Sequence, residues 1–432
     1  QPTQLADWWK NFKDPMLDQL ITQAVSGNLT LKQAEARIRQ ARAQRGISGA
    51  ALWPTVNATG AYDRERASRN GTGAGFSGLP PGAFPDQNLY QTGFDASWEI
   101  DVFGGLRRSL ESADANVGVA LEDRRDVLVS LLAEVALNYI ELRGYQRQIE
   151  VANSNLDAQR QTLVLTRNQF EGGVATGLNV AQAEAQVATT AATIPPMETQ
   201  LRIRIHQLGI LLGREPMSLS TLLTPSKPIP AVPPAVPLGM PSELLRQRPD
   251  IRRAERQLAS ATAQIGVATA DLFPKFYLTG GAAYQSTNMR NLFSPPSFMW
   301  SLGPNMTWQI FDAGSVRFNI KVQEAKQEEI AAAYRQTVLT ALREVEDALV
   351  TYSQEQIHNK ALADAVEANR QATDISMKLF MYGKTDFINV LNAQLALFTS
   401  QDQLVQSDRA LSTSVVSLYK ALGGGWDALE RK

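Results

Sequence analysis

The order of apolar and polar residues along this chain first predicts long helices. From residue 106 to residue 171 there is no proline, glycine occurs only at Gly118 and Gly144, and an apolar residue returns every seven positions. These apolar residues are Leu128, Val135, Leu142, Ile149, Leu156, Leu163 and Phe170. A heptad pattern of this length is typical of a coiled-coil helix. We therefore predict one helix over 106–171, and a rise of 1.5 Å per residue makes it about 100 Å long.

A second segment, 315–382, contains neither glycine nor proline and is predicted to form a matching long helix. Its heptad positions hold Val338, Val345, Tyr352, Val366 and Phe380. Shorter helical patterns lie at 17–52, 179–212, 242–272 and 387–422. In each half of the chain the two shorter patterns add up to roughly 100 Å, about the length of one long helix. We therefore expect two short helices stacked end to end beside each long one.

Four further segments alternate apolar and polar residues with a period of two, which predicts strands with one apolar face. The strongest alternation runs from Tyr90 to Val102, and the others lie near 55–63, 275–285 and 298–310. In the last of these segments Pro304 interrupts the apolar side. We predict that the strands pair as hairpins over 54–103 and 274–311. The connecting segments 67–88 and 287–297 are then expected to be exposed loops.

The chain also contains an internal duplication. Five residues recur 210 positions later: Phe170, Gly173, Asn179, Val180 and Ala183 return as Phe380, Gly383, Asn389, Val390 and Ala393. Another block recurs 220 positions later, in which Ala34 and Pro54 correspond to Ala254 and Pro274. The ten-residue difference falls in the hairpin loop, so we predict two structural repeats, 1–213 and 242–432, the second ending in a short tail. The 214–241 segment between them contains eight prolines and is expected to be an extended connector.

The strand residues indicate contact with lipid. Aromatic residues lie where the strands meet the helices, as in the interfacial girdle of a membrane barrel: Trp53, Phe103, Phe273 and Phe311. Strands of about 13 residues exceed the 9 to 11 or so that cross a bilayer at a tilt. Four strands cannot close a barrel, and an open sheet edge in lipid leaves backbone groups unpaired, so the chain is expected to oligomerise. The alternative is a soluble coiled-coil scaffold in which the apolar strand faces are buried.

Composition mainly excludes other classes of protein. The 42 basic and 43 acidic residues nearly cancel, which argues against nucleic-acid binding. There is no cysteine, and His206 and His358 are the only histidines, so metal and acid–base chemistry has few residues to use. We therefore expect no enzyme, no cofactor and no metal site. No run approaches 18 apolar residues, which argues against a transmembrane helix, and residues 1–11 do not resemble a signal peptide.

Five separated strings make the chain resemble a known family. They are WWKNFKDPMLDQL (8–20), WEIDVFGGLR (98–107), PSELLRQRPDI (241–251), IFDAGSVR (310–317) and LYKALGGGW (418–426). They are similar to the TolC-like outer membrane factors, in particular the branch that works with resistance-nodulation-division pumps in multidrug efflux. The resemblance implies a mainly α fold with a membrane β-barrel part. In this fold a homotrimer with four strands per chain forms a 12-stranded β-barrel and a long coiled-coil α-barrel.

The resemblance also assigns residues to the tips of the two helical hairpins, where the family meets its periplasmic adaptor. In the first repeat these are Gly173, Val174, Ala175 and Thr176, and in the second they are Gly383, Lys384 and Thr385. An ordinary helix–helix turn that uses glycine for a left-handed residue explains the same positions without a partner. The two interpretations are compatible, because a glycine turn also lets a partner approach the backbone.

Just past each tip the family commonly places acidic residues at a constricted periplasmic gate. The matching positions here are Asn179, Asn389 and Asn392, beside an apolar Ile388 and an aromatic Phe380. A carboxylate ring on a symmetry axis repels itself and attracts cations, whereas amides donate and accept hydrogen bonds without either effect. We hypothesise that amide hydrogen bonds and apolar contact close this entrance, and that it is less cation-selective than its relatives. The alternative for Asn179 is a helix cap.

The resemblance finally implies a location and a function. The chain is expected in the bacterial outer membrane, in contact with its lipid and extending into the periplasm. There it would be a passive exit duct for drugs and other small toxic compounds, supplied by an inner-membrane pump through the adaptor. A duct for type I protein secretion or for heavy metals is the alternative within the same fold. Many members of the family begin with a lipidated cysteine, a residue that this sequence does not contain.

Overall fold

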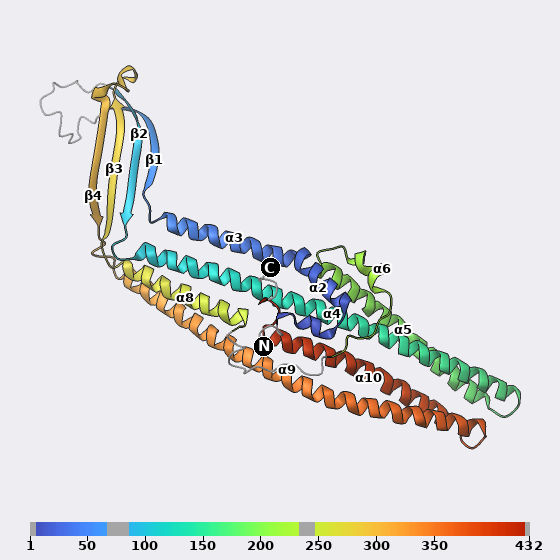
Figure 1. The fold of residues 1–432 in the computed structure, drawn as a ribbon. Coiled ribbons are helices and arrows are strands. Elements are labelled where there is room, and N and C mark those ends of the chain that lie inside the picture. The colour runs from blue at the N-terminus through green and yellow to red at the C-terminus, as the bar shows by residue number, and fades with distance from the viewer. Residues whose placement is uncertain (1–5, 67–85, 233–246, 428–432) are drawn as a thin grey trace. The chain divides into compact units, whose positions relative to one another are not determined.

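The computed structural model of this chain describes residues 6–66, 86–232 and 247–427. The chain forms two compact units, which we name the tip unit and the sheet unit. The tip unit consists of 1–37, 120–254 and 334–432, and the sheet unit consists of 38–119 and 255–333. Each unit combines segments of both repeats, so neither repeat is a compact body by itself. Figure 1 shows the order of the elements along the chain.

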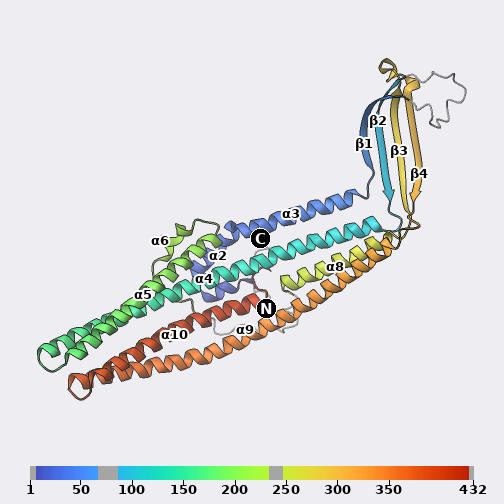
Figure 2. The ribbon, with the colours of Figure 1, turned by 180° about the vertical axis from the view of Figure 1, so that it is seen from behind.

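Two helices of 67 residues, α4 (Gly105–Glu171) and α9 (Ser315–Met381), are the longest elements. Each is followed by a turn and a helix of 35 residues, α5 (Gly177–Leu211) or α10 (Phe387–Ala421). In the tip unit α4 lies beside α5 and α9 lies beside α10, which makes two helical hairpins (Figures 1 and 2). These bounds agree with the predicted helices to within two residues, because the heptad pattern continues up to each turn.

The prediction of a single short helix over 17–52 is wrong, because the segment forms two helices. These are α2 (Pro15–Gly27) and α3 (Leu29–Ala50), separated by Asn28, whose backbone is extended with φ −60° and ψ 127°. The Asp14 carboxylate caps the start of α2 by accepting from two backbone N–H groups. Asn28 caps α3 by accepting from the N–H of Leu31 at 2.9 Å. Local capping therefore divides a segment whose apolar pattern is continuous.

The connector is less extended than predicted. Its first part forms a 3-10 turn, η2 (Pro216–Leu219), and a short helix, α6 (Ser220–Leu223). Proline is compatible with the first position of η2, since an N–H there has no helical partner. Leu219 and Leu223 are buried, and this packing stabilises the turn against the prolines around it.

The third of the predicted shorter helices, α8 (Pro249–Ala270), begins later than predicted. The prediction placed its start at residue 242, and residues 233–246 lie outside the described parts of the chain. Within α8 the Asp250 carboxylate accepts from the backbone N–H of Ile251 at 2.9 Å, which satisfies one of the free donors of the first turn.

The sheet unit contains one antiparallel sheet in the order β1-β2-β3-β4. Its strands are β1 (Thr55–Glu65), β2 (Gln87–Ile100), β3 (Lys275–Ser286) and β4 (Phe298–Thr307). Strands β2 and β3 come from different repeats and pair with Trp98 opposite Leu278. The two predicted hairpins are therefore present and share one sheet. Pro304 lies on β4, an edge strand, where a missing N–H donor is tolerated.

The two predicted hairpin loops differ in how much of them is described. Residues 67–85 of the first loop lie outside the described residues. The second loop contains two 3-10 turns, η3 (Met289–Asn291) and η4 (Pro295–Ser297). The Asn288 side chain accepts from the N–H of Arg290 at 3.0 Å and so caps the first of these turns.

In each repeat a tryptophan forms a hydrogen bond with the segment that connects a short helix to a strand. The Trp98 indole N–H donates to the carbonyl oxygen of Leu52 at 2.9 Å, and that of Trp308 donates to Leu272 at 3.1 Å. Trp98 and Trp308 are 210 positions apart, while Leu52 and Leu272 are 220 apart, so the two bonds are equivalent under the duplication. The repeat is therefore preserved in hydrogen bonds as well as in sequence.

The largest apolar core of the tip unit surrounds the N-terminal segment. The 3-10 turn η1 (Trp8–Phe12) is buried there, and the Trp8 ring stacks on the Tyr419 ring at 5.3 Å. The hydroxyl of Tyr139 on α4 donates to the Asp14 carboxylate at 2.8 Å. Because large buried rings contribute much of the packing energy, this segment holds α4 and α10 together.

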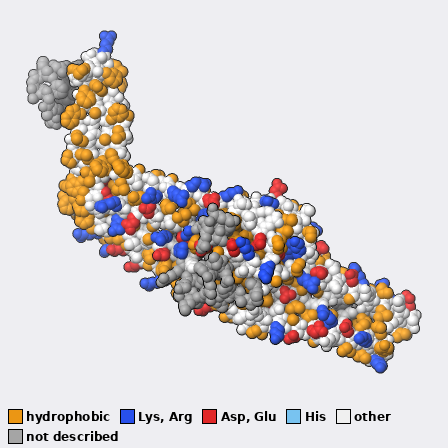
Figure 3. Space-filling model, viewed as in Figure 1, with side chains coloured by type: hydrophobic (Ala, Val, Ile, Leu, Met, Phe, Trp, Pro, Cys, Tyr) orange, Lys and Arg blue, Asp and Glu red, His pale blue; other side chains and the backbone are white. Residues whose placement is uncertain are grey.

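The strands carry their apolar residues on the surface. Figure 3 shows hydrophobic side chains over the visible face of the sheet, with few charged ones among them. The most exposed of these residues include Val56, Phe94, Trp300, Leu302 and Met306. An apolar surface of this kind on regular strands suits contact with lipid. Among the described helices, none combines the length and hydrophobicity that crossing a membrane requires.

Replacing Gly213 by alanine is expected to destabilise the tip unit. Gly213 has φ +68°, and an added Cβ would lie 2.3 Å from the carbonyl oxygen of Gly27. The left-handed backbone alone costs about 1–2 kcal/mol for a residue with a Cβ. Gly46 in α3 is the matched control, since nothing lies within 4 Å of its added Cβ and alanine there is expected to stabilise by up to about 1 kcal/mol. Thermal unfolding of the purified protein measures both, and equal melting temperatures for the two variants would contradict this account.

Candidate functional site

The two hairpin tips are built by the same backbone turn. At the first tip Val174 N–H donates to the carbonyl of Gln169 at 2.8 Å, and at the second Lys384 N–H donates to Leu379 at 2.9 Å. Gly173 and Gly383 have φ +75° and +66°, and their added Cβ atoms would meet no atom within 4 Å. This is the Schellman ending of a helix, in which glycine supplies the left-handed residue. The turn therefore requires glycine for its backbone and leaves the surrounding surface open.

At the first tip the Asn179 amide is used within the turn. Thr176 and Asn179 form a reciprocal capping box, in which the Asn179 oxygen accepts from the Thr176 N–H at 3.2 Å and the Thr176 hydroxyl accepts from the Asn179 N–H at 3.4 Å. The helix-cap alternative for Asn179 is thus present in the structure. Ala175 also belongs to the turn, where its N–H donates to Gln169 at 3.1 Å.

At the second tip the predicted asparagines divide into two kinds. The Asn389 amide donates to the hydroxyl of Thr385 at 2.8 Å, so it too is used within its own turn. Asn392 is exposed, and its side chain has no hydrogen-bond partner among the residues that the structure describes. Ile388 is also exposed and lies four positions before Asn392, so the two share one face of α10. Of the predicted gate residues, Ile388 and Asn392 are the exposed ones whose side chains form no hydrogen bond among the described residues.

Phe380 is partly buried and packs against a small apolar core near the tips. Its ring lies 5.2 Å from the buried Phe387 ring, and Val390 and Ala183 complete the buried cluster. Ala183 belongs to the first hairpin, so this core joins the two hairpins close to their tips. The core therefore stabilises the relative position of the two tips by burying apolar surface.

Sequence reasoning missed a row of polar contacts between α4 and α10. Gln148 donates to Asp402 at 2.8 Å, Asn155 donates to Gln401 at 2.8 Å, and Gln394 donates to Thr162 at 2.9 Å. The α4 members are spaced by seven residues, each directly before a residue of the apolar heptad stripe. This spacing of seven residues is a pattern from which the polar contacts could have been predicted. The two hairpins thus meet through side-chain hydrogen bonds along this row, each of which contributes about 0.5–1.5 kcal/mol net.

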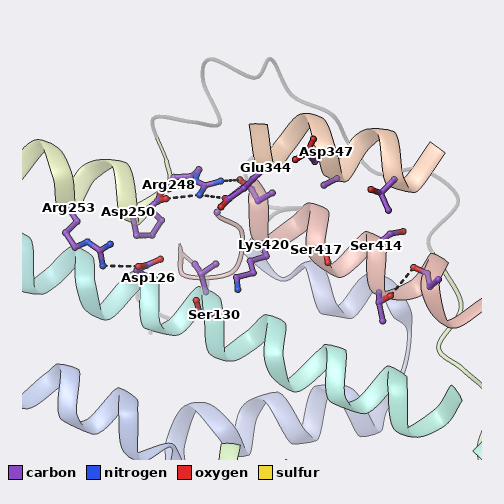
Figure 4. A pocket seen from close by; sticks show the side chains of 18 residues that line it. Asp126, Ser130, Arg248, Asp250, Arg253, Glu344, Asp347, Ser414, Ser417 and Lys420 are labelled. Atoms are coloured by element: carbon purple, nitrogen blue, oxygen red, sulfur yellow. Dashed lines mark hydrogen bonds and ion pairs between the residues drawn. The ribbon is translucent and has the colours of Figure 1, made fainter. Parts of the chain in front are cut away.

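A charged cavity of about 700 Å³ lies in the tip unit between α4, α8, α9 and α10 (Figure 4). The buried Arg248 guanidinium donates to the Asp250 and Glu344 carboxylates, each at 2.7 Å. Arg253 donates to Asp126 at 3.0 Å. Burial raises the pKa of the Asp126 carboxyl, and the Arg253 guanidinium lowers it in part. Among the described residues no cluster of carboxylates and histidines is arranged to hold a metal ion.

The predicted girdle residues are all exposed, and two of them touch. The rings of Phe103 and Phe273 stack at 4.6 Å with an angle of 16° between their planes. Trp53 and Phe311 are more exposed than this pair, at 74% and 87%. Exposed aromatic rings beside the strand ends suit the interface between lipid and water, and their role as a girdle stays a prediction.

Comparison with known proteins identifies the family. The sequence model of the outer membrane efflux protein family matches residues 20–214 and 240–424. The chain belongs to this family. The pyoverdine export outer membrane protein OpmQ of Pseudomonas aeruginosa is 34% identical over 427 residues, which cover 98% of this chain and 88% of that protein. The toluene efflux pump outer membrane protein TtgF of Pseudomonas putida is 32% identical over 432 residues, covering 99% and 88%.

Solved structures agree with this assignment. The outer-membrane channel OprN superposes with a TM-score of 0.92 at 37% identity, covering 97% of this chain and 92% of that one. This outer membrane efflux protein therefore has the TolC-like fold, a mainly helical barrel with a β part. It is an efflux duct of the outer membrane that extends into the periplasm. The predicted family, fold class and location are confirmed.

Removing the first cap is expected to loosen the first tip. Asn179→Ala removes one half of the capping box, the bond to the N–H of Thr176, and the loss of one hydrogen bond costs about 1 kcal/mol. The backbone N–H groups of the first turn of α5 should then exchange with solvent faster, as hydrogen–deuterium exchange measures. Asn392→Ala is the control and should leave exchange at both tips unchanged, since its side chain has no bond among the described residues. Equal exchange in the Asn179 variant and the wild type would show that the box contributes nothing.

Proposed function

We propose that this protein is the outer-membrane exit duct of a tripartite efflux pump, which passively conducts drugs and other small toxic compounds. The observation that carries the proposal is that the duct ends in two tips of the same backbone geometry, exposed and open at their glycines. Relatives similar over nearly the whole chain include a toluene efflux protein and a pyoverdine export protein, which supports small molecules as the transported class. No catalytic step is needed for this role.

The duct requires three copies of the chain. Its sheet has β1 and β4 as edges and exposes apolar side chains, so a single sheet in lipid leaves two rows of backbone groups unpaired. Pairing β4 of one copy with β1 of the next removes both edges. Three copies of four strands give a 12-stranded barrel, the size that the family resemblance implies.

The tips are the docking surface for a periplasmic membrane-fusion adaptor, which couples the duct to an inner-membrane resistance-nodulation-division transporter. Val174 at the first tip is 78% exposed, and Tyr382 at the second is 77% exposed. Large apolar side chains with this exposure are costly in solvent and are typical of a surface that a partner covers. The open space around Gly173 and Gly383 lets a partner helix approach the backbone closely.

The gate is closed by the exposed face of α10 that carries Ile388 and Asn392. Asn179 and Asn389 position the tips through their own turns, as described above. Around a threefold axis, three copies of Asn392 can donate and accept hydrogen bonds without the repulsion of a carboxylate ring. Three copies of Ile388 supply apolar contact beside them.

Deletion of the gene in its host tests the proposed function. The strain should become more susceptible to several small toxic compounds, and the wild-type gene should restore resistance. Affinity purification of the intact protein should recover an adaptor and a transporter. Unchanged susceptibility in a strain without a second outer-membrane duct would contradict the pump role.

A charge at the first tip should uncouple the duct from its adaptor. Val174→Asp places a carboxylate on the apolar docking surface, and burying it unpaired costs several kcal/mol, so resistance should fall by about tenfold or more. The minimal inhibitory concentration of a transported drug measures the effect. Met289→Asp is the matched control, because it adds the same charge at an exposed methionine in the hairpin loop between β3 and β4. Equal resistance in the two variants at equal expression would exclude Val174 from docking.

Asn392→Asp should make the entrance more cation-selective. Three added carboxylates near one axis attract cations and repel each other, which amides do not. Reversal potentials of the reconstituted pore under a salt gradient measure the preference. Gln336→Glu on α9 adds the same charge far from the tips and should not change it. No difference between the Asn392 variant and the wild type would sink the amide-gate hypothesis.

A further inference from the structure

The strands of the sheet unit have one end at the helices and the other end at the hairpin loops. The helical part of the family's fold extends into the periplasm, so the loop end of the strands faces the exterior. At this end β1 ends at Glu65, β2 begins at Gln87, and a loop with two 3-10 turns joins β3 to β4. Figure 3 shows basic charge at this end, beyond the hydrophobic side chains that cover the visible face of the strands.

Aromatic side chains cross the apolar face of the sheet just before this end. Tyr62 lies opposite Tyr90, and their ring centroids are 4.9 Å apart. Tyr284 lies opposite Phe298, with 5.5 Å between the ring centroids. The Tyr62 hydroxyl donates to the Asn88 amide oxygen at 3.0 Å, in the direction of the exterior end. Tyrosines with an apolar ring and a polar hydroxyl are typical of the membrane–water interface, so this row marks the level of the lipid head groups.

Three exposed arginines follow the aromatic row on its exterior side. Arg64 comes two residues after Tyr62 on β1, so it shares the apolar face and lies about 7 Å further along the strand. Arg66 follows after the same spacing, and Arg290 lies in η3 of the loop between β3 and β4. The side chains of Arg64 and Arg66 are 66% and 69% exposed. The arginines therefore lie at or just beyond the level of the head groups.

These three arginines share a single carboxylate among the described residues. Arg64 pairs with Asp86 at 3.4 Å, and Arg66 pairs with the same carboxylate. Arg290 has no ion-pair partner within the described ranges. Three cations and one anion leave a net charge of +2 on this surface of each chain.

The acidic residues of β1 do not balance this charge on the apolar side of the sheet. Asp63 and Glu65 alternate with Tyr62 and Arg64, which places them on the polar face. Glu65 also accepts a hydrogen bond from the Gln87 amide at 3.1 Å. The positive excess thus lies on the side that contacts lipid, where the phosphate groups of head groups are the anions at hand.

We propose that Arg64, Arg66 and Arg290 bind the phosphate groups of phosphorylated lipids in the outer leaflet of the membrane. A planar guanidinium can donate two parallel hydrogen bonds to one phosphate. The stems of these long side chains lie along the apolar surface, while the rings of Tyr62 and Tyr90 pack beside the acyl chains. Bound lipid then fixes the height of the strands in the membrane. The inference uses the outer-membrane location of the family and does not depend on the pump role.

Binding of lipid A, a glycolipid that carries phosphate groups, tests the proposal on the purified protein in an uncharged detergent. Native mass spectrometry over a lipid titration measures the dissociation constant. Replacing all three arginines by glutamine should weaken binding about a hundredfold, since each basic residue near an anionic surface contributes about fivefold. Arg335→Gln is the matched control and should bind like the wild type. Arg335 is exposed on α9, twenty residues after the helix begins, which is about 30 Å along its axis.

A second variant should change binding in the opposite direction. Asp86→Asn removes the carboxylate that Arg64 and Arg66 share, so lipid A should bind about fivefold more tightly. A folding defect does not produce tighter binding. This variant therefore decides the question even if the triple arginine variant does not fold.

Unchanged affinity in the triple arginine variant or in Asp86→Asn overturns the proposal. Equal affinity for dephosphorylated lipid A also overturns it, because apolar contact then accounts for all of the binding. Displacement of lipid A by an equal concentration of inorganic phosphate would indicate a site for free anions and overturn the assignment to lipid. The effect of deleting the gene is independent of these results, so a failure here leaves the proposed function untouched.

Discussion

The rest of this structure depends on how helix ends satisfy their backbone groups. A helix leaves its last carbonyls and first N–H groups without partners, and each pair of stacked short helices brings two such ends together in the interior of the tip unit. The chain solves this with one side chain per joint, Asn28 or Arg248, bonded to the last carbonyl of α5 or α10. Just past the ends of α3 and α8, the indoles of Trp98 and Trp308 likewise bond the carbonyls of Leu52 and Leu272. Helices can stack end to end because the carbonyl groups at these ends have hydrogen-bond partners.

The tips extend the same argument to function. Asn179 and Asn389 each form a hydrogen bond within their own turn, Asn179 with the N–H of Thr176 and Asn389 with the hydroxyl of Thr385, so part of each amide is already used there. Ile388 and Asn392, which share one face of α10, are left exposed. The polar row between α4 and α10 and the apolar cluster around Phe387 then set how firmly the two hairpins are held together.

Much of the fold could be predicted from sequence, and the errors have a common cause. The heptads predicted α4 and α9 to within two residues, because a helical period repeated over many turns is a strong signal. The break at Asn28 was missed, since the apolar pattern continues across it and only a side-chain cap ends α2. The short helices in the connector were missed, since proline-rich composition hides the buried Leu219 and Leu223. At the candidate site, the two tip turns could be predicted from their glycines. The hydrogen-bond partner of each asparagine could not be predicted.

The sequence by itself determined the two long helices, the paired strands, the duplication and the family, because these follow from periodicity and local motifs. Only the tertiary structure decided what the equivalent positions do. Asn28 and Leu211 are 183 residues apart, and Arg248 is 173 residues from Ala421 and 96 from Glu344. No local pattern pairs groups at such separations, and the choice between a neutral joint and an ionic one depends on which side chains meet in space. The two repeats therefore have the same helices and strands, but different side chains bond the ends of their helices.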